Sequence, residues 1–427
     1  MGNKMNEEIL ALDDVDEAAA DISEGLSCLE SFYEFYSELT SKPEISLEDY
    51  NQATSIFKQF QISTGYPIET TSLEDVNSLG DAGKDLITAL WTFVKNISRV
   101  IMIAIRKSIE FIKKIIVKMF SGQDEIVRRS EKIILRSKSR KDSLKSESFI
   151  KASEVIKACT VEDKLITGVE ASQRLLDFAN NVVKVWVPNP MNKVLDDFRE
   201  DIFSIAEDQD NVVFNKLLNE LGKMQMVPLG THPKKISAAD IKEHYGFVWS
   251  ASSKENYVDF FASETLPGNR AFVSFIPKNK DTKSPEFLKT VGLFGYDFMT
   301  YRTKIKTDSS IRVISPTEIR QIASNIREAV NVSRPVIKRL DNVADIKKNI
   351  YKALDKFQMD TNHQTNMSND KETAQTKAKE IRSTIVFIKA QLDQLDKPAV
   401  PYMKHLLVTG NALLDYCDKS LSSFEKN

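Results

Sequence analysis

Apolar residues recur at helical spacing along most of this chain, and one stretch interrupts the pattern. Between residues 245 and 314, aromatic and β-branched runs are separated by Pro-Gly, Lys-Asn-Lys and Asp-Ser-Ser turn signals, which predict four to six strands. The chain holds only 14 glycines in 427 residues, which favours helices over many tight turns. The sequence therefore predicts a mainly α protein with elongated helical domains and a small β-sheet insertion at about 245–314, α+β overall.

A few residues mark where helices should begin and end. Ser315-Pro316-Thr317-Glu318 is expected to start a helix, with proline in its first turn. Gly122 is expected to end the helix over residues 84–120. Helical spacing dominates from residue 149 to about 226.

Residues 84–120 form the most apolar segment of the chain. Their longest uncharged runs, 86–94 and 100–105, contain nine and six residues, whereas a membrane-spanning helix needs about 20. Charged residues recur along one narrow stripe, which predicts an amphipathic helix with a wide apolar face. Packing against neighbouring helices is the ordinary interpretation of such a face, and contact with a membrane surface is the alternative.

The charge of the chain changes sign near residue 74. Residues 1–74 hold 16 Asp and Glu against 3 Lys and Arg, a net charge of −13. Residues 75–427 hold 45 acids and 56 bases, a net charge of +11, and the two values give the −2 of the whole chain. Such asymmetry indicates a polyanion-binding body with an acidic appendage. An acidic helical domain beside a basic one is the alternative.

Most of the positive excess lies in residues 84–151, which hold 17 bases and 7 acids. A basic cluster can neutralise DNA phosphates without sequence preference, although a solvated helix surface explains it equally well. Residues 123–148 contain no aromatic residue, so stacking on single-stranded bases is not indicated. The candidate DNA contacts are Arg128, Arg129, Lys132, Arg136, Lys138, Arg140, Lys141 and Lys145.

The sequence offers no recognisable catalytic or cofactor motif. The four histidines are isolated from one another, and the usual metal-binding and phosphate-binding spacings are missing. We therefore expect no enzyme activity, no cofactor, and no catalytic or metal-ligating residue. His405 and Cys417 lie twelve residues apart on one expected helix, about 18 Å along its axis, so a core cysteine and a surface histidine are expected. Arg270 and Arg302 are candidates for facing an anion.

Four stretches in the first 140 residues resemble the internal head proteins of large tailed bacteriophages, the phiKZ-like phages and related giant myoviruses. They are LSCLESFYEFYSEL, ISLEDYNQATSIFKQFQI, PIETTSLEDV and the amphipathic stretch from LITALWTFVKN to IVRRSEKII. The resemblance implies a virion protein of the capsid interior, packed with genomic DNA after assembly in the host cytoplasm. It also implies cleavage by the phage head maturation protease after Glu in a small-x-Glu sequence.

Two tripeptides match that cleavage pattern. Ser72-Leu73-Glu74 lies where the charge changes sign, and Ser46-Leu47-Glu48 is a second match. Under the resemblance, the acidic leader would screen the basic body until cleavage. The implied partners are genomic DNA, the maturation protease, and other internal head, capsid or portal proteins.

These observations predict five segments. They are an acidic helical leader (1–74), an amphipathic basic helical region (75–148), a helical domain (149–244), a small β-sheet region (245–314) and a C-terminal helical bundle (315–427). Two other functions fit the same sequence. One is an injected host-directed effector or enzyme whose activity lies in residues 245–314, and the other is a membrane-active protein that uses the 84–120 helix.

Overall fold

The computed structural model describes residues 116–144, 149–185, 228–246, 257–278, 295–302, 310–340 and 398–426, together with Ser55, Glu110, Lys113, Lys114 and Val187. In these residues the protein is mainly helical with small antiparallel sheets. This confirms the predicted fold class.

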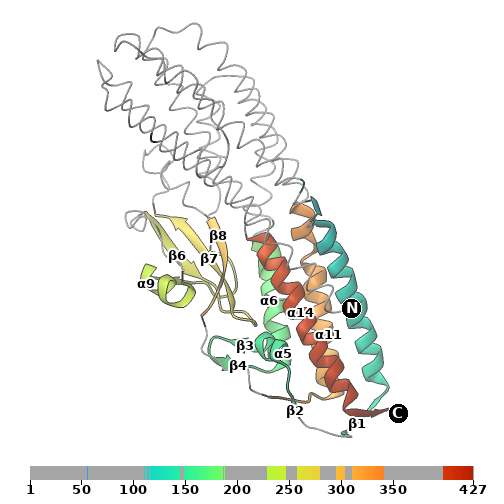
Figure 1. Cartoon of the computed structure of the whole chain (residues 1–427). Coiled ribbons are helices and arrows are strands. Elements are labelled where there is room, and N and C mark those ends of the chain that lie inside the picture. Colours follow the sequence, from blue (N-terminus) through green and yellow to red (C-terminus); the bar gives the residue numbers. More distant parts are fainter. Residues whose placement is uncertain are drawn as a thin grey trace, which may run out of the picture.

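In the part of the chain that the structure describes, long helices lie side by side (Figure 1). They comprise residues 116–138, α6 (Gly168–Val185), α11 (Pro316–Val332) and α14 (Ala399–Ser422). Helix α11 packs against both α6 and α14. Its buried side chains recur every three or four residues, as expected for a helix inside a bundle, and comprise Ile319, Ile322, Ala323, Ile326, Ala329 and Val330.

The start of α11 agrees with its sequence. Ser315 is the N-cap, and its hydroxyl accepts a hydrogen bond from the backbone N–H of Glu318 at 3.3 Å. The Glu318 carboxylate accepts one from the backbone N–H of Ser315 at 2.8 Å. Pro316 occupies the first helical position, where no intrahelical N–H bond is lost. The prediction of a helix start here is confirmed.

Gly122 does not end a helix, so this prediction is wrong. Residues 116–138 are helical without interruption. Gly122 is buried, and a Cβ atom built on it would lie 3.3 Å from Cδ1 of Leu407 on α14. The small residue therefore allows two helices to approach closely, and the packing outweighs the low helix propensity of glycine.

The main sheet has four antiparallel strands in the order β5 (Lys234–Ile236), β6 (Val258–Ala262), β7 (Arg270–Pro277) and β8 (Gly295–Thr300). Strands β6, β7 and β8 lie inside the predicted 245–314 range, between helices α6 and α11 in chain order. Strand β5 lies before it. Its sequence, Lys-Lys-Ile, has no aromatic residue and is too short to show an alternating pattern.

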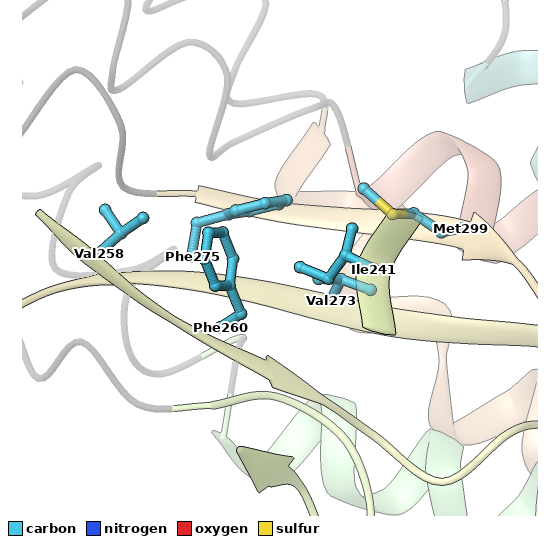
Figure 2. Packing of buried hydrophobic residues seen from close by; sticks show 6 residues of the cluster. All are labelled: Ile241, Val258, Phe260, Val273, Phe275 and Met299. Atoms are coloured by element: carbon cyan, nitrogen blue, oxygen red, sulfur yellow. The ribbon is translucent and has the colours of Figure 1, made fainter. Parts of the chain in front are cut away.

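The sheet is covered on both faces. One face packs on the helices, where the Phe272 ring stacks on Phe178 of α6 at 5.4 Å and the Phe298 ring lies 6.2 Å from Tyr402 of α14. The other face is covered by η2 (Ile241–Tyr245), which follows the short α9 (Ala238–Asp240). Figure 2 shows the apolar cluster there, formed by Ile241, Val258, Phe260, Val273, Phe275 and Met299.

Short strands join distant parts of the chain. Strand β1 (Arg140–Leu144) pairs with β10 (Phe424–Lys426), and β2 (Phe149–Ile150) pairs with β9 (Ile311–Arg312). Strands β3 (Thr160–Val161) and β4 (Lys164–Leu165) form a hairpin after α5 (Ser153–Ala158). Strands β2, β3 and β4 lie where helical spacing dominates the sequence, because two-residue strands leave no periodic signal.

Candidate nucleic-acid interface

The basic residues of the 116–138 helix and of the strand after it divide into two sets. One side of the helix faces the protein interior, where Ile126, Ser130, Ile133 and Ser137 are buried. Basic side chains beside this buried side reach α14 and its C-terminal extension, and those on the opposite side face solvent. The two sets have different chemistry.

Arg129 belongs to the inward set. Its guanidinium donates to the carboxylates of Asp415 at 2.5 Å and Asp418 at 2.9 Å, and to the side-chain oxygen of Asn411. Burial lowers the pKa of Arg129, but the hydrogen bonds and charges of Asp415 and Asp418 outweigh burial and raise it above its ordinary value. The positive charge of Arg129 is therefore neutralised by two carboxylates of α14, and the side chain links the two helices.

Two further arginines bind the same part of the chain. Arg136 donates to the other oxygen of Asp418 at 2.6 Å, and Arg140 donates to the backbone carbonyl of Phe424 at 3.0 Å. Three of the eight candidate DNA contacts thus bind groups of residues 411–424. We call the contacts of Arg129, Arg136 and Arg140 with these residues the C-terminal clasp.

The outward set consists of bases with solvent-exposed side chains. Arg128 is 79% exposed in its side chain and lies 3.9 Å from Glu125, while Lys132 and Lys138 are also exposed. Lys114 and Lys118, which were not among the candidate contacts, are exposed too. Because helical neighbours on one side recur every three to four residues, Lys114, Lys118, Arg128 and Lys132 lie along one side of the helix. We call these four residues the basic strip.

The basic strip spans about 27 Å along the helix axis, at 1.5 Å per residue over 18 residues. This length allows contacts with several phosphates of a duplex, without any base-reading geometry. Acidic residues interrupt the helix surface at Asp124, which pairs with Arg334 at 2.7 Å, at Glu125, which lies 3.9 Å from Arg128, and at Glu131. The arrangement suits weak, salt-sensitive binding of a polyanion.

The other candidate positions are placed less completely. Lys141 lies in β1, which pairs with the C-terminal strand, and Lys145 lies outside the described residues. Both cleavage candidates, Ser72-Leu73-Glu74 and Ser46-Leu47-Glu48, also lie outside them. Most of the 84–120 segment is likewise undescribed, but Ile116 and Met119 at its end are buried in the fold.

The described residues give no indication of catalytic chemistry. Burial raises the pKa of the Cys159 thiol to about 12, and it also raises the pKa of Cys417. Both thiols are therefore protonated and poor nucleophiles. In the same part of the chain, no three His, Cys, Asp or Glu side chains are placed to hold a metal ion. None of the helices described there combines the length and apolar character that crossing a membrane requires.

The structure corrects one expectation about His405. This residue was expected at the surface, but it is only 8% exposed, because α14 is covered by the sheet along this side. Its ring lies 5.3 Å from that of Phe298. Of the two arginines proposed to face an anion, Arg302 is exposed, whereas Arg270 is half-buried beside His405.

Comparison with known proteins identifies a family. A family model described as phiKZ-like phage internal head proteins matches residues 4–419. The resemblance noted in the first 140 residues therefore extends over nearly the whole chain. No curated protein and no solved structure matches significantly.

Proposed function

Because this chain belongs to the family of phiKZ-like phage internal head proteins, which gives it a structural role inside the virion head, we propose that its basic body binds the packaged genomic DNA without sequence preference. The observation that carries this proposal is the basic strip, whose four side chains project into solvent. The arginines of the C-terminal clasp already have partners and contribute little.

We also propose that the acidic leader is removed during head maturation. Cleavage after Glu74 would change a chain of net charge −2 into one of +11, and a cut after Glu48 would be an earlier step. Sequencing the N-terminus after co-expression with the maturation protease tests this. A new N-terminus other than Asp75 or Asp49 contradicts it. The remaining proposed partners are other internal head, capsid or portal proteins, which the body would meet during assembly in the host cytoplasm.

The DNA proposal is tested with a fragment of residues 75–427 and a random-sequence duplex, by fluorescence anisotropy over a series of salt concentrations. The double variant R128Q/K132Q should bind more weakly. The slope of log K against log salt should become shallower by about 2, since each phosphate contact contributes about 0.9.

A matched control removes two positive charges elsewhere. Lys164 and Lys338 are exposed and lie outside the basic strip, so K164Q/K338Q should keep nearly the wild-type slope. If both double variants lose affinity equally, only the net charge matters and the basic strip is not the DNA contact. Two DNA duplexes of equal length but unrelated sequence should bind with the same affinity, because the basic strip contacts phosphates and not bases.

A further inference from the structure

The turn between β6 and β7 lies directly on α14. A β-bridge joins Leu266 to Arg270 across this turn, and Gly268 has the positive φ of +82° that glycine tolerates. A Cβ atom on Gly268 would lie 3.0 Å from Cε1 of His405 and 3.3 Å from the hydroxyl of Thr409. The turn therefore brings Arg270 and His405 together at the junction of sheet and helix.

Arg270 lacks the partners that a half-buried guanidinium needs. Its five N–H groups have one hydrogen bond, a long one of 3.4 Å to the carbonyl of Phe298. Across the residues that the structure describes, Arg270 forms no ion pair, and Asp297 acts on its charge only from a longer range. Burial lowers the pKa of Arg270, which shows the cost of removing this cation from water.

His405 presents an unused nitrogen at the same junction. Its Nδ1 lies 3.2 Å from the hydroxyl of Thr409, whereas Nε2 is buried without a hydrogen-bond partner. The backbone carbonyl of Pro267 lies near the ring, but it does not form a hydrogen bond of good geometry with Nε2. If the Thr409 hydroxyl donates to Nδ1, the ring proton must sit on Nε2. An N–H donor without a hydrogen-bond partner then lies at the same junction as the incompletely paired guanidinium of Arg270.

We propose that Arg270 and His405 form a binding site for a phosphate-type oxyanion. The guanidinium can hold two of its oxygens in a bidentate arrangement, and the Nε2–H of His405 can donate to a third. The bound anion would supply the counter-charge that Arg270 lacks. Both side chains contact Phe298 of β8. The guanidinium of Arg270 donates to the backbone carbonyl of Phe298, and the ring of His405 lies against the ring of Phe298. One strand therefore positions both residues. The site is separate from the basic strip.

Thermal unfolding of the full chain in phosphate, acetate and chloride at constant ionic strength tests this proposal. At a phosphate concentration about ten times its Kd, the melting temperature of the wild-type protein should rise by about 2 °C relative to chloride. The rise should disappear in R270Q. It should be largely lost in R270K, which keeps the charge but not the planar fork. The exposed control R302Q should keep the rise.

A second measurement does not depend on how stable the variants are. The ³¹P NMR line of inorganic phosphate should broaden with the wild-type protein and with R302Q, but not with R270K. Equal stabilisation by phosphate and acetate, or equal phosphate effects in R270K and R302Q, would overturn the proposal. Measuring the binding of a DNA duplex to the wild-type protein and to R270K identifies the source of the oxyanion. If R270K also weakens duplex binding, the oxyanion is a DNA phosphodiester, and if not, it is a free phosphate compound.

Discussion

At the scale of single residues, the burial of His405 between sheet and helix makes the stability of the protein depend on pH. Burial lowers the pKa of His405 to about 3, and the positive charge of Arg270 adds to this effect. The ordinary value is about 6.5, so the folded state binds a proton less readily than the unfolded chain. The contribution of a neutral His405 to stability is therefore complete above pH 6.5 and is lost as the pH falls toward about 3.

We predict that the free energy of unfolding falls more steeply with acid in the wild-type protein than in H405Q. Between pH 6 and pH 4 the difference in slope should approach about 1.4 kcal/mol per pH unit, the value for one proton. Urea unfolding at several pH values measures it. The lowered carboxylate pKa values of Asp240 and Glu318 affect both proteins equally. Parallel slopes would show that His405 accepts a proton without unfolding the junction.

At the scale of elements, the sequence predicts well those features that local chemistry determines. Ser315, Pro316 and Glu318 occupy positions where a capping box satisfies the first N–H groups, so the start of α11 follows from four residues. The aromatic and β-branched runs of β6, β7 and β8 are equally local. Gly122 was misjudged because its role depends on Leu407, which is far away in sequence and unpredictable from a single chain.

The candidate interface is less predictable than the fold elements. Basic residues were recognised by type, but burial and partners decide which of them reach solvent. Arg128 and Arg129 are adjacent and chemically identical, yet only Arg129 faces Asp415 and Asp418. That pairing follows from the parallel packing of the 116–138 helix on α14. Nothing in the local sequence of either segment reveals it.

The C-terminal clasp should stabilise the packing of these two helices. We predict that D418N lowers the free energy of unfolding by about 1 to 3 kcal/mol, because Asp418 receives charge-assisted hydrogen bonds from both Arg129 and Arg136. D124N is the matched control, since Asp124 is exposed and, among the described residues, pairs with Arg334. It should change stability by about 0.5 kcal/mol or less. Urea denaturation of both variants measures the difference, and equal effects would show that the clasp is an ordinary surface ion pair.

At the scale of the whole molecule, segments from distant parts of the chain share one core. The 116–138 helix contacts α11 through Gln123 and Val330, and it contacts α14 through the C-terminal clasp. The sheet packs on α6 and α14. All these contacts involve residues after the proposed cleavage sites. Removal of residues 1–74 would therefore leave the contacts of the described core in place while changing the net charge by 13 units.

Under the proposed function, an acidic leader in the same chain would compete with DNA at a high effective concentration. Cleavage would end this advantage, because the released leader would act only at its own concentration in solution. We predict that cleavage after Glu74 tightens binding of a random-sequence duplex by about tenfold or more at 50 mM salt, and by less at 200 mM, where screening weakens both interactions. Anisotropy measured before and after protease treatment checks this. The double variant E48Q/E74Q, treated identically, should stay uncut and keep the weaker affinity. Equal affinities of the cut and uncut chains would contradict the screening role of the leader, whereas the R128Q/K132Q experiment would still report on the basic strip.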